Sequence, residues 1–229
     1  MATSRTVRPP VAAMSITTGA IVAIVFLLLG ILATVAHSQL LFFDQPIRKA
    51  ILDVGALVSV DVMESVGSLG SRYVLWPLTL AGSILVWRHC RQLAVLLLAT
   101  AVTALAVELF LKFLVARPRP ADVGFGASFP SGHVVAAMAW WGLVPALLYV
   151  MTRRRWVWAT AMVAMVAIVL AVGTSRVLLS AHWPSDVVGG ILLGFVFLAV
   201  AEWAIRRDWP WPRCGACVVH NPTATVLST

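Results

Sequence analysis

The sequence has few charged residues and few cysteines for its length. Of its 229 residues, 11% are charged and 61% are hydrophobic, whereas a soluble domain is usually about half apolar and about a quarter charged. The shortage of charge excludes an ordinary soluble fold and indicates a polytopic membrane protein. Three cysteines, Cys90, Cys214 and Cys217, provide no disulfide framework.

Acidic residues are also scarce, and the net charge is +8. A strongly basic protein can bind nucleic acid, but nucleic-acid binding usually needs one continuous basic face. Here the cations form short clusters between apolar runs. We therefore exclude nucleic acid as a partner and take the bilayer as the partner of the apolar surface.

Six apolar runs have the composition of membrane-spanning helices. They cover Ile16–Val35, Tyr73–Trp87, Leu93–Val115, Gly132–Tyr149, Val157–Val172 and Val187–Ile205. We predict an all-α fold, in which residues 1–229 form a single membrane domain with six transmembrane helices. The first run could instead belong to a cleaved signal peptide, but its apolar core is long for one.

The basic clusters predict how the chain is oriented in the membrane. Cations with little acid occur in the N-terminal tail (1–14), in the turns at 88–91 and 153–155, and in the C-terminal tail (206–229). By the positive-inside rule, these segments are cytoplasmic. We therefore expect a multi-pass protein of the cell membrane with both termini in the cytoplasm.

The segment 38–71 is less apolar than the runs around it and contains most of the acidic residues of the first half of the chain. Asp44 and Pro46 are typical of a helix start, and Ile47, Ile51 and Val54 recur at helical spacing. We interpret 38–71 as an extracytoplasmic amphipathic connector lying on the membrane surface. It could guide substrate or serve only as a packed connector.

Three polar segments interrupt the later apolar runs, at 112–120, 130–133 and 175–186. About forty residues separate His133 from Ser175, which is enough for two membrane crossings joined by a turn. The segment 112–120 is connected to Pro130 by a short loop. All three segments should therefore meet on the same face, which is the outer one in the predicted orientation.

Three cations in these segments indicate an anion-binding site. Lys112, Arg119 and Arg176 have only Asp122 and Asp186 as nearby acids in this interpretation. Arginine forks match phosphate oxygens, and lysine adds a point charge. Charged side chains at a membrane boundary are costly, so a functional phosphate site explains them better than chance.

Two predicted helix starts complete a phosphate cradle. Pro130 and Pro184 are suited to the first turn of a helix, where free backbone N–H groups and the helix dipole attract anions. Gly132 allows a ligand to approach the backbone closely, and Ser131 offers a hydroxyl donor.

Two histidines could act on a phosphate held there. Asp186 lies four residues after His182, so its carboxylate can fix the tautomer of that imidazole and leave the other nitrogen as a nucleophile. His133 could then protonate the leaving oxygen. A metal site made of the same three side chains is possible, but the neighbouring cations argue against a divalent ion.

The cytoplasmic tail contains a separate candidate metal site. Cys214, Cys217 and His220 could bind zinc, but they lack a clear fourth ligand. Their role stays open.

The three segments together resemble the type 2 phosphatidic acid phosphatase (PAP2) superfamily. The family pattern appears here as Lys112…Arg119-Pro120, Pro130-Ser131-Gly132-His133 and Ser175-Arg176…His182…Asp186. The resemblance implies a helical core like that of the vanadate haloperoxidases and hydrolysis of a lipid phosphate or diphosphate without metal or other cofactor. It implies His182 as the nucleophile that becomes a phosphohistidine, Asp186 as its partner and His133 as acid and base. The phosphate ligands it implies are Lys112, Arg119, Ser131, Gly132 and Arg176.

Substrates in the family include undecaprenyl diphosphate, phosphatidylglycerophosphate and phosphatidate. Two alternatives remain at this point. The same site could transfer the phosphoryl group to an acceptor other than water, or the cradle could only bind or transport a phosphorylated lipid. The oriented imidazole disfavours the binding protein, because binding alone has no use for it.

Overall fold

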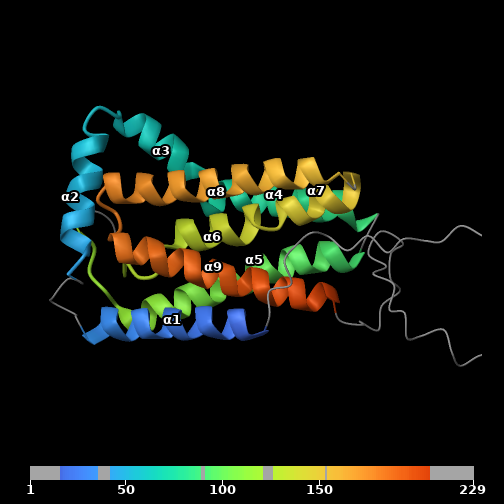
Figure 1. Ribbon diagram of the computed structural model, residues 1–229, viewed down its shortest axis with the longest axis horizontal. Helices are drawn as coiled ribbons and strands as arrows, with labels where there is room; N and C mark the ends of the chain where they lie inside the picture. Colours follow the sequence, from blue (N-terminus) through green and yellow to red (C-terminus); the bar gives the residue numbers. More distant parts are fainter. Residues whose placement is uncertain (1–15, 36–41, 89–90, 121–125, 153, 207–229) are drawn as a thin grey trace, which may run out of the picture.

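The structure is a computed structural model that describes residues 16–35, 42–88, 91–120, 126–152 and 154–206. These ranges fold into α-helices joined by short turns (Figure 1). The helices are α1 (Ile16–Val35), α2 (Asp44–Gly55), α3 (Val60–Ser68), α4 (Arg72–Trp87), α5 (Arg91–Val115), α6 (Gly132–Trp141), α7 (Val144–Thr152), α8 (Arg155–Leu178) and α9 (Pro184–Arg206).

Five segments of the described chain are long and apolar enough to cross a membrane. They are Val60–Trp87, Arg91–Val115, Gly132–Tyr149, Arg155–Leu178 and Pro184–Ala201. The all-α bundle is thus confirmed with five candidate spans. The sixth predicted span coincides with α1, where Ile21–Ile31 is a shorter apolar stretch by the same measure, so six spans stay a prediction.

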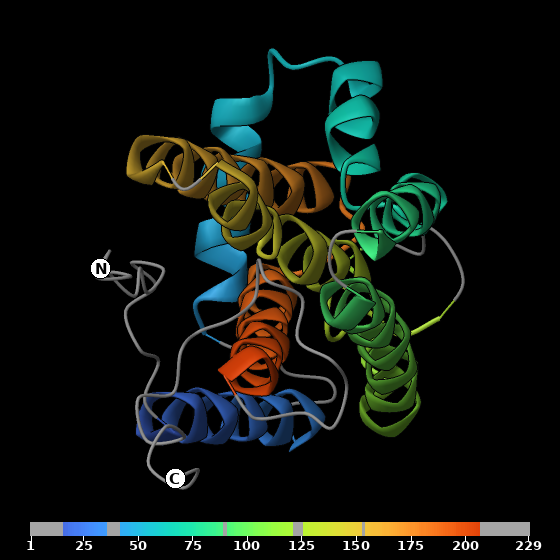
Figure 2. The same ribbon diagram turned by 90° about the vertical axis from the view of Figure 1, so that its right-hand side faces the viewer.

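The long helices run side by side along the longest axis of the molecule (Figure 1). The view along that axis puts α6 in the middle (Figure 2), where it contacts α4, α5, α8 and α9. On the outside of the bundle, α1 packs along α9. Because α6 carries His133, the central helix brings that histidine between the other motifs.

Close packing of α6 against α9 depends on glycines. A Cβ atom at Gly194 would overlap Met138, and one at Gly190 would lie 2.9 Å from the Val134 Cβ and the Ser131 carbonyl oxygen. Small residues allow membrane helices to approach this closely. The contact fixes the start of α6 beside the start of α9, where two of the three motifs lie.

One end of the bundle is crossed by α2, which runs nearly at right angles to the long helices (Figure 1). The predicted connector 38–71 therefore contains α2, α3 and the residues that join them. Asp44, at the start of α2, is completely buried. Within this segment, α3 also belongs to the candidate span Val60–Trp87, and the location of the segment at the membrane surface stays a prediction.

The end of α8 differs from the predicted one. The sequence predicts a span over Val157–Val172, but α8 continues to Leu178, so Ser175 and Arg176 lie in its last turns. Pro184 begins α9, as predicted from its suitability for the first turn of a helix, although the apolar run itself starts only at Val187. Polar residues end an apolar run in the sequence without ending the helix, because their backbone groups still bond within it.

Candidate active site

All three polar segments reach the end of the bundle that α2 crosses. One cavity, about 170 Å³ in volume, is lined on its polar side by Lys112, Arg119, Gly132, His133, Arg176 and His182, together with Arg72 and Glu108. The structure therefore brings the residues of all three segments together around one cavity, as the sequence predicts. Two other predicted residues, Ser131 and Asp186, are fully buried directly behind this polar side.

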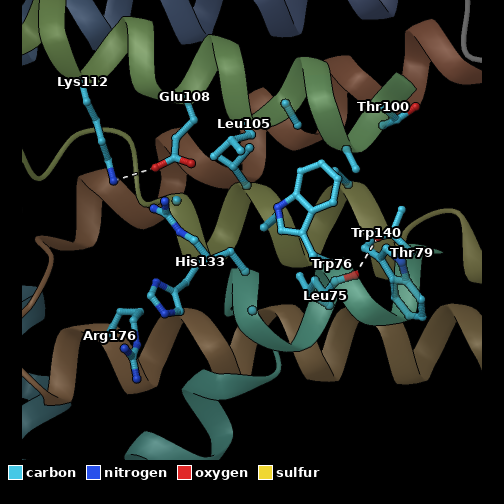
Figure 3. A pocket seen from close by; sticks show the side chains of 18 of the residues that line it. Leu75, Trp76, Thr79, Thr100, Leu105, Glu108, Lys112, His133, Trp140 and Arg176 are labelled. Carbon is cyan, nitrogen blue, oxygen red and sulfur yellow. Dashed lines mark hydrogen bonds and ion pairs between the residues drawn. The ribbon is translucent and has the colours of Figure 1, made fainter. Parts of the chain in front are cut away.

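Lys112 has an acidic partner that the sequence did not lead us to expect. Its Nζ lies 2.7 Å from Oε1 of Glu108, one helical turn earlier on α5. Glu108 is only 4% exposed and reaches into the cavity beside Lys112 (Figure 3). The expectation of three cations with only Asp122 and Asp186 nearby was wrong, and the i,i+4 spacing of this pair was the signal that could have revealed it.

The start of α6 forms one wall of the site. Ser131 is its N-cap, and the buried Ser131 Oγ has no hydrogen-bond partner among the described residues. The first N–H groups of a helix have no acceptor within the helix, so this end offers donors to an anion. A Cβ at Gly132 would overlap the Glu108 carboxylate, which explains glycine at this position.

The loop from α8 to α9 positions His182. Ser180 has a φ of 54°, a left-handed conformation that is uncommon for residues other than glycine and turns the chain back toward the cavity. The backbone N–H of His182 then donates to the Arg176 carbonyl at 3.3 Å. The imidazole is 2% exposed, so this histidine is held inside the protein with one face on the cavity.

His182 and Asp186 are neighbours, as predicted from their spacing. The imidazole Nδ1 lies 3.5 Å from Asp186 Oδ2 but has no hydrogen-bond partner among the described residues. Asp186 Oδ2 accepts from the Trp183 N–H at 2.8 Å. Burial lowers the pKa of His182 below its ordinary value of 6.5, and Asp186 partly opposes this shift. The arrangement favours a neutral imidazole, which is the form that can attack phosphorus.

Arg176 extends from the last turns of α8 toward α3. Its guanidinium is packed over Gly67 of α3, where an added Cβ would overlap it, and donates weakly to the Met63 carbonyl at 3.4 Å. Figure 3 shows it near His133 at the polar end of the cavity. Arg119 also lines the cavity and donates to the carbonyl oxygens of Gly126 and Ala181 at 3.2 and 3.4 Å.

A buried ionic network lies behind His182, and the sequence did not predict it. Arg117 is 3% exposed and donates to Asp186 Oδ1 at 2.7 Å, to Ser185 Oγ at 2.6 Å and to Asp44 Oδ2 at 2.6 Å. Asp44 in turn accepts from the N–H and the hydroxyl of Ser185 at 2.8 and 2.7 Å. Arg117 thus joins the carboxylate behind the proposed nucleophile to α2.

A second contact from α2 holds the same loop. Arg48 donates to Ser180 Oγ at 2.8 Å, and its guanidinium carbon lies 5.8 Å from the centre of the Trp183 ring. The Trp183 indole N–H donates to the Pro118 carbonyl at 3.1 Å. The loop that carries His182 is therefore fixed from two sides, by α2 and by the segment around Pro118.

The other end of the cavity is apolar and extends along α5 between α4 and α6. Its lining includes Leu75, Trp76, Leu97, Ala101, Leu105, Ala139 and Leu143. From Lys112 to Leu97 the rise of α5 corresponds to roughly 20 Å. The cavity thus joins a polar end with cations and histidines to an apolar slot inside the bundle.

One cavity in the helix bundle is thus surrounded by two histidines, a buried carboxylate and a cluster of cations. Such a set of side chains is typical of a membrane phosphatase. The PAP2 superfamily model matches residues 92–210, which is just over half of the chain. The chain therefore belongs to the PAP2 superfamily, and the resemblance found in its three motifs is confirmed.

Similar proteins come from bacteria, archaea and mammals. Glucose-6-phosphatase 3 of Bos taurus is 35% identical over 98 residues, which are 41% of this chain and 27% of that protein. Phosphatidylglycerophosphatase B of Escherichia coli is 38% identical over 89 residues, which are 36% of this chain and 30% of that protein. The chain thus matches less than a third of that relative's length. Undecaprenyl-diphosphatase of Sulfolobus acidocaldarius is 26% identical over 190 residues, or 76% of this chain and 84% of that protein.

A crystal structure with a similar fold is that of a transmembrane PAP2-type phosphatidylglycerolphosphate phosphatase from Bacillus subtilis. It has a TM-score of 0.64 and 26% sequence identity, and covers 81% of this chain and 94% of that chain. The similarity extends to most of the bundle, beyond the three motifs.

Proposed function

We propose that the protein is an integral-membrane phosphatase that removes phosphate from a lipid phosphate or diphosphate through a phosphohistidine at His182. The observation that carries this proposal is the cavity. Its polar end contains Lys112, Arg119, Arg176 and both histidines, and the same cavity continues into an apolar slot within the bundle. A phosphate with an apolar tail fits both ends, whereas a soluble phosphate ester would leave the slot unused.

The chemistry divides between the two histidines. The free imidazole nitrogen of His182 attacks phosphorus, and the bond from phosphorus to the leaving oxygen breaks as His133 gives that oxygen a proton. In the second step His133 takes a proton from water, the water oxygen attacks the phosphohistidine, and inorganic phosphate leaves. The cations and the start of α6 stabilise the charge on the phosphate oxygens in both steps.

The names of the similar proteins do not by themselves decide the class of substrate. They refer to phosphatidylglycerophosphate, to undecaprenyl diphosphate and, in Glucose-6-phosphatase 3, to glucose 6-phosphate. The apolar slot of the cavity favours the lipids. We propose a substrate from these lipid classes or phosphatidate. Transfer to an acceptor other than water remains the alternative for the same site.

For the membrane arrangement we propose six spans, with α1 as the first and the cavity on the extracytoplasmic face. The positive-inside pattern supports this orientation. Arginines follow α4 and begin α5 and α8, and these helix ends lie at the end of the bundle opposite α2 and the polar end of the cavity (Figure 1). With the native cysteines replaced, Asp61→Cys should react with an impermeant thiol reagent added outside, and Arg154→Cys should not. The reverse pattern would invert the orientation.

Purified protein should release inorganic phosphate from phosphatidylglycerophosphate, phosphatidate or undecaprenyl diphosphate, and EDTA should not abolish the activity. The fixed cations already supply the charge that a divalent ion supplies in other phosphatases. Phosphate release in a coupled assay is the measurement. Activity lost on chelation and restored by a metal ion would contradict the mechanism, and binding of these lipids without release of phosphate would favour the binding protein.

The pH dependence of the first step should reflect the lowered pKa of His182. Because burial lowers this pKa below 6.5, the imidazole stays neutral at lower pH than usual, and the burst rate with nitrophenyl phosphate should fall only below pH 6.5. Asp186 raises this pKa, so Asp186→Asn should move the fall to still lower pH, besides slowing the reaction. The unaltered enzyme and Asp186→Asn are measured with the same ester, so the ionisation of the ester affects both profiles equally. A fall beginning above pH 6.5, or one that moves upward in the variant, would contradict the assignment.

A further inference from the structure

Glu108 is an acidic residue in the wall of a cavity otherwise suited to anions. Its side chain is 5% exposed, and its carboxylate both pairs with Lys112 at 2.7 Å and packs against Gly132. Both Glu108 and Gly132 line the cavity, so the carboxylate lies beside the start of α6, where the phosphate is expected to bind. Figure 3 shows Glu108 entering the cavity from α5 between Lys112 and Leu105.

The position of Glu108 along α5 determines which part of a substrate meets it. Lys112 lies at the polar end of the cavity, and Leu105, Ala101 and Leu97 follow one another toward its apolar end. Glu108 is one turn, about 6 Å along the axis, from Lys112 in the same direction. With the reacting phosphate beside Lys112 and the tail in the slot, the group attached to the phosphate must pass Glu108.

That group differs in charge between the two classes of lipid. In a phosphomonoester it is an alkoxy carbon, which is neutral. In a diphosphate it is a second phosphate, which is anionic and would lie next to a buried carboxylate. Like charges at short range and low exposure repel strongly, and within the cavity the cation nearest to Glu108, Lys112, is also needed by the reacting phosphate.

We propose that Glu108 is a specificity-determining residue that disfavours substrates with a second phosphate directly attached to the one removed, and so favours lipid phosphomonoesters. The inference rests on the proposed function and adds a substrate class to it. It also separates this protein from what its similarity to an undecaprenyl-diphosphatase alone would imply.

The expected effect is large enough to measure. One unit charge at about 6 Å, at an effective dielectric constant of about 20, changes a rate or affinity by roughly 100-fold. Lys112 offsets part of that field, so we expect about a tenfold effect on the relative use of the two substrate classes.

Farnesyl phosphate and farnesyl diphosphate are the probes, because they have the same tail and differ only in the second phosphate. In Glu108→Gln, the ratio of kcat/KM for the diphosphate to kcat/KM for the monophosphate should rise about tenfold over the unaltered enzyme. Glu108→Asp, which keeps the charge, should leave the ratio within about threefold. A ratio within one preparation does not depend on the fraction of protein that is folded.

Glu64→Gln is the matched control. Glu64 is exposed on α3 and acts electrostatically on Arg176. The substitution therefore removes the same unit of charge near the cavity, at a residue that does not lie on the path of the leaving group. It should leave the ratio unchanged. An unchanged or lowered ratio in Glu108→Gln, or an equal rise in Glu64→Gln, would overturn the role of Glu108 while leaving the phosphatase intact. Absence of phosphate release from every lipid tested, by the unaltered enzyme, would instead overturn the proposed function.

Discussion

Replacing His182 by alanine should abolish turnover of every phosphate ester, whatever its leaving group. Without the imidazole there is no nucleophile in the cavity, and loss of a nucleophile from a catalytic set typically lowers kcat by about 10⁵-fold or more. The measurement is phosphate release by purified protein from a lipid phosphate and from nitrophenyl phosphate. His182 is buried in a tightly held loop, so thermal unfolding of the variant must be compared with that of the unaltered protein.

Replacing His133 should have an effect that depends on the leaving group. A lipid alkoxide is a poor leaving group and needs the proton that His133 supplies, whereas nitrophenolate needs little help. General acid catalysis typically contributes about 100- to 10,000-fold, so His133→Ala should lose that factor on the lipid and largely keep the first step on nitrophenyl phosphate. Equal losses on both esters would mean that His133 has another role.

Replacing Arg117 by alanine should destabilise the protein severely. The substitution leaves the fully buried carboxylates of Asp44 and Asp186 without their shared cation. Breaking a buried ion pair from one side typically costs about 3–5 kcal/mol, which corresponds to a fall in melting temperature of about 6–20 °C in a domain of this size. Turnover should fall too, because Asp186 loses the partner that fixes it behind His182.

Arg119, two residues later, is the matched control. It is half-buried and, within the described part of the chain, makes two long hydrogen bonds to backbone carbonyls. Arg119→Ala should therefore raise KM for the phosphate ester while the melting temperature changes by little. Thermal unfolding in one detergent compares the two variants. A stable Arg117→Ala protein, or an Arg119→Ala protein that melts as early as Arg117→Ala, would contradict the division between a positioning and a phosphate-binding arginine.

The convergence of the motifs could be predicted from the sequence because it depends on helix length alone. The distance from His133 to Ser175 allows two crossings, and the structure has α6, α7 and α8 there. Glu108 could also have been recognised, since it lies one turn from Lys112 on a predicted helix. The family pattern contains the cations of the first motif but no acid one turn before them, so the pattern alone does not indicate Glu108.

The network behind His182 could not be predicted in the same way. Arg117 bonds to residues 73 positions before it and 69 after it, and no local pattern pairs such distant residues. Asp44 was interpreted only as the start of a helix, which it is. What the sequence does not contain is the direction of α2 across the end of the bundle, because that direction is set by packing against α8 and α9.

The most direct test of the account is to identify the phosphorylated residue. His133→Ala protein mixed with nitrophenyl phosphate and quenched in base should show one burst of nitrophenol and then stall, because no base activates water for the second step. Mass spectrometry of the digested protein should find one phosphoryl group on His182, labile in acid and stable in base, and none in the His133→Ala/His182→Ala double variant. A phosphoryl group on another residue, or full turnover with His182 removed, would contradict the central claim that His182 is the nucleophile.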